Sequence, residues 1–238
     1  MNRSKNFCVW HTGRCGSTVL SSMLNQHSQI YCTEELLEGY SKLYKRLKYK
    51  PLAWLGSKLL IRYAMLNNYA EIFGLEMKVW HLYRLDANVS EAMNFLALIG
   101  IDKHIVLERQ NYLRVIASSN VSKKRSSWHI RSQNKPTLTK VYVNPGGLAY
   151  AIQTFSDFYN ELKVLLGENC LWLTYEKDIL QNPQAAFDKV VNFLELNQIK
   201  PKISLGQTNP YSLKEIVLNF DEISNKLKNT PHEWMLEF

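Results

Sequence analysis

Apolar residues follow two alternating patterns along this chain. Short, nearly continuous apolar runs are typical of buried strands, and longer stretches with apolar positions every three or four residues are typical of amphipathic helices. The alternation predicts an α/β protein. The predicted strands cover residues 7–10, 30–33, 74–82, 104–107 and 170–175, and the predicted helices cover residues 17–26, 36–69 (a pair broken at Pro51), 85–100 and 148–166, with two more that begin near residues 183 and 212.

The first predicted strand runs into the first helix through the turn HTGRCGST. Gly13 and Gly16 lack a Cβ, so the backbone of this turn can adopt left-handed angles and approach a ligand closely. The first N–H groups of the helix have no partner within it and point at the turn. Arg14 adds a permanent cation, and Ser17 and Thr18 add hydroxyl donors. The turn therefore predicts a site for a phosphate-like anion, with an ordinary glycine turn before a helix as the alternative.

Two features of a magnesium-dependent nucleotide site are missing from the sequence. A Walker A loop has the pattern G-x-x-x-x-G-K-[ST], whereas Ser17 follows Gly16 directly, without the lysine. No later apolar strand ends in the aspartate that holds magnesium, because residues 104–107 are followed by Glu108 and Arg109. A P-loop kinase or NTPase is therefore the second interpretation, and magnesium-dependent ATP binding would favour it.

Composition narrows the class of protein. The length of 238 residues suits one α/β domain, and the net charge of +8 favours anionic ligands, either a small cofactor or a nucleic acid. The sequence shows neither a membrane span nor an N-terminal signal segment, so we expect a cytoplasmic protein. The cysteines lack metal-ligand spacing and are expected to be reduced thiols. They are Cys8, Cys15, Cys32 and Cys170.

The anion turn resembles a loop of the PAPS-dependent sulfotransferases (PAPS is 3′-phosphoadenosine 5′-phosphosulfate). In that family the pattern [KR]-x-G-[ST]-[ST] after the first strand binds the 5′-phosphosulfate. The residues that match it position by position are Arg14, Cys15, Gly16, Ser17 and Thr18.

A second segment resembles the family's 3′-phosphate motif. Arg109 stands at the end of a predicted strand, and Ser118 follows on the next predicted helix. An arginine fork binds a phosphate bidentately, and a hydroxyl one or two helical turns along supplies another donor. Two matches in residue type and spacing are more specific than either alone. The chain is similar to the bacterial carbohydrate and natural-product branch of the family.

The general base of this branch is a glutamate after the second strand. The sequence LNQHSQI repeats the spacing that precedes this strand in the family, with Ser28 where proline is usual. The resemblance implies Glu35 as the base, with its neighbour Glu34 as the alternative. The lengths of the first helix and second strand return both glutamates to the sheet edge where the anion turn lies. The competing interpretation is that both occupy the first turn of the next helix, where the helix dipole favours carboxylates.

Lys78 and His81 belong to the third predicted strand, GLEMKVWHL. Many sulfotransferases have a lysine in this strand, and the cytosolic hormone and phenol branch continues it as K-T-H, with the histidine as the base. The spacing is one residue longer in this chain, and only a strand that ends near Trp80 lets His81 turn into the site. The resemblance implies Lys78 as a ligand of sulfuryl oxygens and His81 as the rival base; a core histidine is the alternative for His81.

The resemblance covers residues 7–227 and implies a single α/β domain over residues 1–238. Its fold would be the P-loop NTPase-like sulfotransferase fold, with a short parallel sheet of about five strands flanked by helices. The implied reaction moves a sulfuryl group from PAPS to a hydroxyl or amine of a small molecule, natural product or sugar, and releases adenosine 3′,5′-bisphosphate without a metal. Residues 38–69 and 121–145 would bind the acceptor, and Gln207 and Thr208 would contact the nucleotide.

The third interpretation is a non-enzymatic module that binds nucleic acid or an anionic membrane. It is based on the net charge and on the basic, helical segment 36–69. It gives no role to Arg109 and Ser118, and steeply salt-dependent binding of nucleic acid would favour it. Our expectation is a small-molecule acceptor as the partner, with no nucleic acid and no membrane span. The sequence leaves the oligomeric state open.

Overall fold

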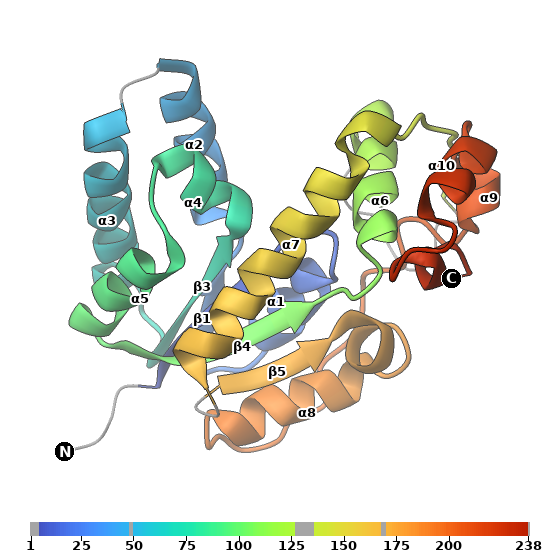
Figure 1. The fold of residues 1–238 in the computed structure, drawn as a ribbon. Helices are drawn as coiled ribbons and strands as arrows, with labels where there is room; N and C mark the ends of the chain where they lie inside the picture. Colours follow the sequence, from blue (N-terminus) through green and yellow to red (C-terminus); the bar gives the residue numbers. More distant parts are fainter. Residues whose placement is uncertain (1–4, 48–49, 127–135, 168–169, 238) are drawn as a thin grey trace. The chain divides into compact units, whose positions relative to one another are not determined.

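A computed structural model describes residues 5–47, 50–126, 136–167 and 170–237 (Figure 1). Its sheet has five strands, all paired in parallel, in the order β2-β3-β1-β4-β5. The strands are β1 (Asn6–His11), β2 (Ile30–Thr33), β3 (Ile72–Lys78), β4 (Ile101–Glu108) and β5 (Cys170–Thr174). The expected α/β fold with a short parallel sheet is confirmed.

The central strand of this sheet is β1, which lies between β3 and β4. Its last residue, His11, is in register with Lys78 of β3 and Leu107 of β4. The carboxyl ends of these three strands therefore meet at one edge, and the turn after β1 begins there. Since the chain continues from β1 to β2 on one side while β4 lies on the other, this is the topological switch point where open α/β sheets bind ligands.

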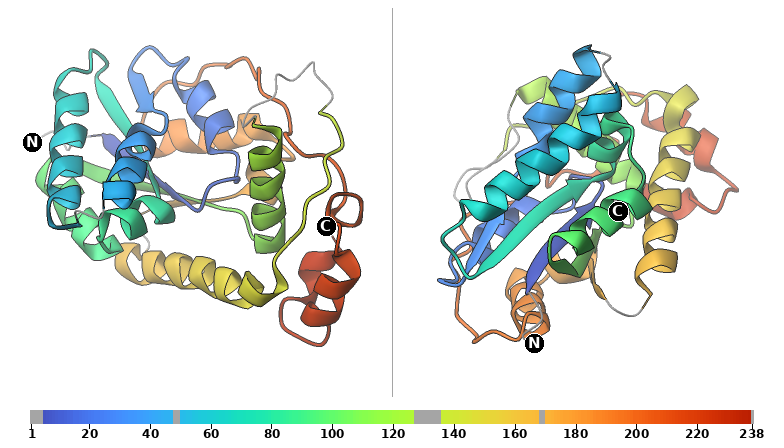
Figure 2. Two further views of the ribbon diagram at one scale, coloured as in Figure 1. Left: turned by 90° about the horizontal axis from the view of Figure 1, so that it is seen from above. Right: turned by 90° about the vertical axis from the view of Figure 1, so that its left-hand side faces the viewer.

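Helices connect the strands and cover the sheet. In chain order they are α1 (Ser17–Leu24), α2 (Leu36–Leu47), α3 (Lys50–Leu66), α4 (Val79–Leu85), α5 (Val89–Leu98), α6 (Tyr112–Arg125), α7 (Pro145–Leu166), α8 (Pro183–Phe193), α9 (Leu213–Ile216) and α10 (Phe220–Leu227), with a π-helical turn η1 (Tyr175–Ile179) and a 3₁₀ turn η2 (Glu233–Leu236). Helices α2 and α3 pack against each other as an antiparallel pair (Figures 1 and 2). The predicted pair of helices is confirmed, but Pro51 is the second residue of α3 and not the point that separates the helices.

Capping residues begin two helices where the sequence predicts them. Asn182 accepts a hydrogen bond from the backbone of α8, and Pro183 is the first residue of that helix. Ser212 and Glu215 form a capping box at the start of α9. Both caps satisfy N–H groups that the first helical turn leaves unpaired. The helix after Ser212 nevertheless ends at Ile216, and the separate helix α10 follows it.

The third strand is shorter than predicted. It ends at Lys78, and residues 79–82 of the expected strand form the start of α4. The Lys78 N–H donates to Nδ1 of His81 at 3.3 Å, which caps a helix instead of extending the ladder. Leu82 and Leu85 are buried one helical turn apart, so helical packing decides the conformation of this segment.

The helix predicted over residues 85–100 also starts later than expected. Asp86 adopts a left-handed conformation that ends α4. Asn88 and Glu91 then form a capping box, so α5 begins at Val89. The sequence signal was present as an Asn-x-x-Glu pattern, but the apolar periodicity runs across it.

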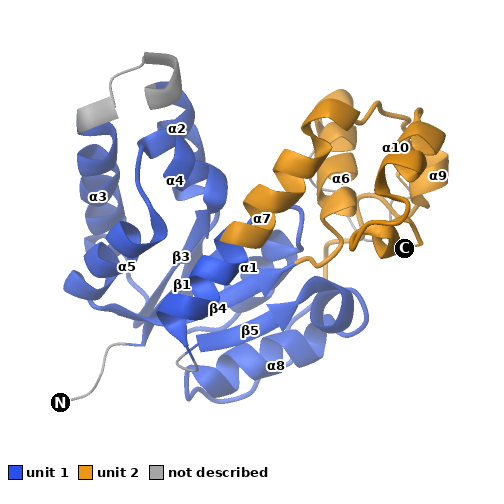
Figure 3. Cartoon of the chain, in the orientation of Figure 1, with its two compact units in different colours: residues 1–108, 158–202 blue, residues 109–157, 203–238 orange. Residues whose placement is uncertain are grey.

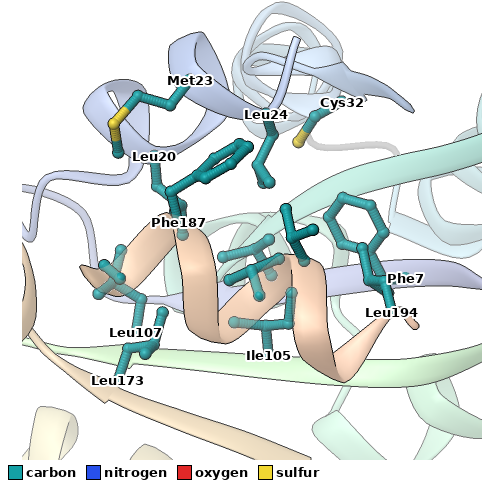
Figure 4. Close-up of a cluster of buried hydrophobic side chains, with 14 of the residues drawn as sticks. Phe7, Leu20, Met23, Leu24, Cys32, Ile105, Leu107, Leu173, Phe187 and Leu194 are labelled. Atoms are coloured by element: carbon teal, nitrogen blue, oxygen red, sulfur yellow. The ribbon is translucent and has the colours of Figure 1, made fainter. Parts of the chain in front are cut away.

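The hydrophobic core lies between the sheet and the helices α1 and α8. Figure 4 shows side chains of these two helices beside those of β1, β4 and β5. Phe187 of α8 is fully buried in this cluster. On β1, the ring of Phe7 fills the space opposite Gly74, where an added Cβ would lie 2.3 Å from the ring.

The chain divides into two compact units (Figure 3). Unit 1 comprises Met1–Glu108 and Phe158–Lys202, and it contains the sheet with α1 to α5 and α8. Unit 2 comprises Arg109–Asp157 and Ile203–Phe238, and it contains α6, α9 and α10. Residues predicted to bind PAPS fall in both units, and the single-domain assignment of residues 1–238 stays a prediction.

The buried position of Phe187 leads to a stability prediction. Phe187→Ala should lower the free energy of unfolding by about 3–5 kcal/mol, because it removes a buried ring and leaves a cavity. Urea unfolding followed by circular dichroism measures this loss. The control is Val164→Ala on α7, where the side chain is 83% exposed and the change should stay within about 0.5 kcal/mol. A loss below about 1 kcal/mol for Phe187→Ala would contradict the described packing.

Candidate active site

The turn between β1 and α1 adopts the left-handed conformations that its glycines predict. The φ angles are 87° at Gly13 and 83° at Gly16, and Arg14 between them is also left-handed at 55°. Left-handed backbone at a non-glycine residue costs energy and persists only where neighbouring contacts impose it. The turn is therefore held in one shape by its surroundings.

The two glycines have different surroundings. At Gly16 an added Cβ would lie 2.6 Å from Ile179 Cγ2 and 3.2 Å from the Tyr175 ring, so the turn η1 packs directly against the loop. At Gly13 an added Cβ would meet nothing within 4 Å among the described residues. The loop is thus crowded at its second glycine and open at its first, which leaves room for a ligand beside Gly13.

Two buried side chains hold the first residues of the turn. Tyr159 of α7 donates its hydroxyl to the Leu107 carbonyl at 3.0 Å and accepts the Thr12 N–H at 3.2 Å. His11 accepts the Gly13 N–H on Nδ1 at 3.1 Å, and the Cys15 sulfur lies 3.4 Å from the same nitrogen. These contacts leave Thr12 and Cys15 buried beneath the turn, so they support it rather than line its open side.

His11 and Glu76 form a buried pair beneath the turn. Nε2 of His11 lies 3.3 Å from a carboxylate oxygen of Glu76, and both side chains are almost completely buried. Burial raises the pKa of Glu76, but the contacts with His11 and the charge of Lys78 outweigh it, so the net pKa is below the ordinary value. Glu76 is therefore ionised at neutral pH and balances the cations gathered at this end of the sheet.

The remaining loop residues provide donors for an anion. Ser17 is the first residue of α1, whose eight residues direct unpaired N–H groups and the positive end of the helix dipole at the turn. Thr18 follows it, and Arg14 contributes its guanidinium from the half-exposed part of the turn. This donor set suits a tetrahedral anion such as a phosphate or a sulfate ester.

Glu35 lies two residues beyond the end of β2, with its side chain half exposed. Its φ of 52° is left-handed. The Lys78 ammonium donates to its carboxylate at 2.7 Å. The neighbouring Glu34 instead accepts a hydrogen bond from Ser21 of α1 at 3.3 Å. The structure thus brings the predicted residues Glu35 and Lys78 together at the carboxyl ends of β2 and β3.

Glu38, which the sequence did not predict, is the centre of a charged network at the start of α2. It contacts Lys42 at 2.9 Å, Arg84 at 3.1 Å and His81 at 3.1 Å, and Lys78 lies 3.7 Å away. The hydrogen bond from His81 and the neighbouring cations lower the pKa of Glu38 far below its ordinary value, although burial opposes them. Glu38 is therefore a permanent carboxylate that holds this group of cations together.

His81 lies within this network and is fully buried. Its Nδ1 accepts the Lys78 N–H, so Nε2 carries the proton that is donated to Glu38. Burial lowers the pKa of His81, and the Lys78 charge adds to this effect, while Glu38 opposes it. Both ring nitrogens are occupied, so His81 orients Glu38 and Lys78 in this arrangement.

The predicted 3′-phosphate residues lie in unit 2. Arg109 follows β4 directly, Ser118 lies in the middle of α6, and both side chains are buried. In the later predicted contact segment, Gln207 is exposed and the Thr208 carbonyl accepts a hydrogen bond from Arg125 at 2.8 Å. These positions test neither the 3′-phosphate assignment nor the nucleotide contact, which stay predictions.

The predicted acceptor segments are described in part. Of residues 121–145, the stretch 127–135, which includes Trp128, lies outside the described residues. Within the described part of the chain, no group of three His, Cys, Asp or Glu side chains is arranged to hold a metal ion. None of the described helices is long and apolar enough to cross a bilayer.

Sequence reasoning missed two elements of this site. Glu38 and Lys42 are four residues apart on a predicted helix, which is the spacing of a helical ion pair, but nothing local indicates that His81 and Arg84 join them. Glu76 alternates with apolar residues in a predicted strand, and only the strand order places it beside His11.

The pKa of Glu38 leads to a prediction about pH. A carboxyl group whose pKa is lowered by folding stabilises the folded state above its unfolded pKa, and this contribution is lost as the pH falls. Glu38→Gln should therefore lower the free energy of unfolding by about 1–3 kcal/mol at pH 7. The difference from the wild type should shrink as the pH falls below the ordinary glutamate value of 4.5.

Urea unfolding of both proteins across a pH series measures this difference. Glu237→Gln, at an exposed position near the end of the chain, is the matched control and should change stability little at neutral pH. A Glu38→Gln effect that stayed constant down to pH 3 would show that the network does not stabilise the ionised carboxylate.

Three solved structures resemble this fold at low sequence identity. A sulfotransferase from Alicyclobacillus acidocaldarius matches at 12% identity with a TM-score of 0.56, over 100% of this chain and 95% of that one. The sulfotransferase domain of the Synechococcus PCC 7002 olefin synthase matches at 16% identity and a TM-score of 0.47, over 100% and 88%. A Mycobacterium avium sulfotransferase matches at 11% and 0.46, over 100% and 78%. No family model and no curated protein matches the sequence. The first similarity shows that this chain has the fold of the sulfotransferases.

Proposed function

We propose that this protein is a PAPS-dependent sulfotransferase that acts on a small-molecule, natural-product or sugar acceptor. The observation that carries the proposal is the turn after β1. It combines the sequence pattern of a 5′-phosphosulfate loop with left-handed glycines at the switch point of a sulfotransferase-like sheet. The proposal includes the cytoplasmic location expected from the sequence.

The phosphosulfate would bind at the open side of the loop. Gly13 leaves space there, and the N–H groups at the start of α1 supply donors that do not depend on protonation. Arg14 adds a guanidinium, which suits the paired oxygens of a phosphate or sulfate group. These donors strengthen as charge develops on the oxygen that leaves with adenosine 3′,5′-bisphosphate, so the chain itself stabilises the leaving group. The proposed reaction therefore uses no metal.

Glu35 would act as the general base. The acceptor oxygen or nitrogen gives its proton to the Glu35 carboxylate while its new bond to sulfur forms and the bond from sulfur to the bisphosphate oxygen breaks. Glu35 suits this role because its side chain is half exposed and is bonded only to Lys78 among the described residues. Lys78 has three donors, so it can hold Glu35 and still contact a sulfuryl oxygen.

Arg109 and Ser118 would bind the 3′-phosphate. Both side chains are buried, and an arginine fork can bind a phosphate bidentately while a hydroxyl adds another donor. Gln207 and Thr208 are assigned to the nucleotide as weaker contacts, and the segments 38–69 and 121–145 are assigned to the acceptor. Aromatic residues in these segments suit a small organic or glycoside acceptor.

Calorimetric titration with adenosine 3′,5′-bisphosphate tests the cofactor. We expect micromolar binding without metal and no binding of ATP with magnesium, because the loop lacks the Walker lysine. Arg109→Ala should weaken bisphosphate binding by about 1.5–3 kcal/mol, which is tenfold or more. Arg62→Ala, at an exposed site on α3, is the control and should bind like the wild type.

The opposite result, magnesium-dependent ATP binding without bisphosphate binding, would replace this proposal with a P-loop kinase or NTPase. Unchanged bisphosphate affinity in Arg109→Ala would reject only the 3′-phosphate assignment.

The base is tested by comparing Glu35→Gln with His81→Asn. Glu35→Gln should keep bisphosphate affinity but lose about 10²–10⁴-fold in turnover, because the amide cannot take the acceptor proton. Transfer of labelled sulfate from PAPS to a panel of phenols and glycosides measures turnover, with Glu71→Gln as an exposed control. An active Glu35→Gln together with an inactive His81→Asn would assign the base to His81 instead.

A further inference from the structure

The outer face of α3 exposes a row of large apolar side chains. Their exposed fractions range from 50% at Leu52 to 76% at Leu66. With 3.6 residues per turn they lie within an arc of about 80° on the helix. We call this set the α3 stripe, and its members are Leu52, Leu55, Leu59, Tyr63 and Leu66.

The α3 stripe is not needed to pack α3 onto unit 1. Ala53 and Ile61, on the other side of the helix, are fully buried. The Trp54 ring packs edge-to-face on Phe95 of α5 at 5.9 Å between centroids. Gly56 brings the backbone so close to Tyr40 of α2 that an added Cβ would overlap its hydroxyl. The stripe is therefore a second apolar face, and five such residues on one helix form a patch of the kind that marks a docking surface.

The charges of α3 have one sign. The helix contains Lys50, Lys58 and Arg62 and no aspartate or glutamate. Arg62 is exposed beside the α3 stripe, and no carboxylate pairs with it among the described residues. The Lys58 ammonium lies 5.3 Å from the centre of the Trp54 ring, at the flank of the same face. An apolar stripe bordered by cations is complementary to a partner surface with an apolar interior and negatively charged groups around it.

We infer that the α3 stripe docks onto an anionic phospholipid bilayer. The leucines and the tyrosine would enter the boundary between headgroups and acyl chains, and the basic residues would contact the lipid phosphates. The net charge of +8 for the whole chain adds attraction over a longer range. This surface binding needs no membrane-spanning helix.

A second copy of this chain is the competing occupant. Two α3 helices would bring together cations that no carboxylate on either helix balances. Charge therefore favours the lipid surface.

Co-sedimentation of the full chain with vesicles tests this inference. We expect binding to vesicles of phosphatidylcholine with phosphatidylglycerol, weaker binding to phosphatidylcholine alone, and a loss of binding as salt screens the charges. The double variant Leu55→Glu/Leu59→Glu should weaken binding by about tenfold or more. It removes two apolar side chains that would be buried in the bilayer, and it adds negative charge that the lipid phosphates repel. Arg62→Ala should weaken binding to the anionic vesicles by about fivefold.

The matched control is Leu98→Glu/Val164→Glu, which makes the same charge change at positions 85% and 83% exposed on α5 and α7. This control should bind vesicles better than the stripe variant, and circular dichroism with thermal unfolding checks that both variants fold. Absence of binding to anionic vesicles, or equal losses in the two double variants, would overturn the inference. So would a wild-type dimer that the stripe variant dissociates while neither protein binds vesicles.

Discussion

The candidate site depends on the buried contact between His11 and Glu76. Glu76 is ionised inside unit 1, and a buried carboxylate is tolerated only when a partner compensates its lost hydration. His11 lies 3.3 Å from that carboxylate through Nε2 and accepts the Gly13 N–H on Nδ1, so the same ring contacts Glu76 and fixes the first turn of the anion loop. Because Glu76 lies two residues before Lys78 on β3, the pair also links the loop to the lysine that holds Glu35.

The location of left-handed backbone distinguishes Arg14 and Glu35, which carry the proposed chemistry, from the other left-handed residues. Six described non-glycine residues have positive φ, and four of them, Asp86, Ser126, Glu195 and Asn229, follow the ends of helices. Left-handed residues are ordinary there. Arg14 and Glu35 instead lie in turns that lead from a strand into a helix, where such strain is less common and is a mark of functional positions. The strain thus agrees with the roles that the sequence resemblance implies for the two residues.

Local chemistry explains why much of this structure could be predicted and part of it could not. The presence of five strands, the glycine turn and the caps at Asn182 and Ser212 depend on residues close in sequence, and these expectations are confirmed. The end of β3 depends on a contact from the Lys78 backbone to a ring in the next turn, which competes with the apolar pattern of a strand. The network around Glu38 depends on partners more than forty residues away, which only the packing of α2 against α4 brings close.

Glu35 and Glu38 show how the network assigns different roles to two neighbouring carboxylates. Glu38 accepts hydrogen bonds from Lys42, His81 and Arg84, and these partners keep it charged and fixed. Without Glu38, the cations Lys42, Lys78 and Arg84 would lose their shared carboxylate and repel one another. With Glu38 in place, Lys78 contacts both carboxylates and the Glu35 side chain stays half exposed. A base needs that exposure to reach an acceptor proton, so Glu38 makes the proposed role of Glu35 chemically feasible without touching the reacting atoms.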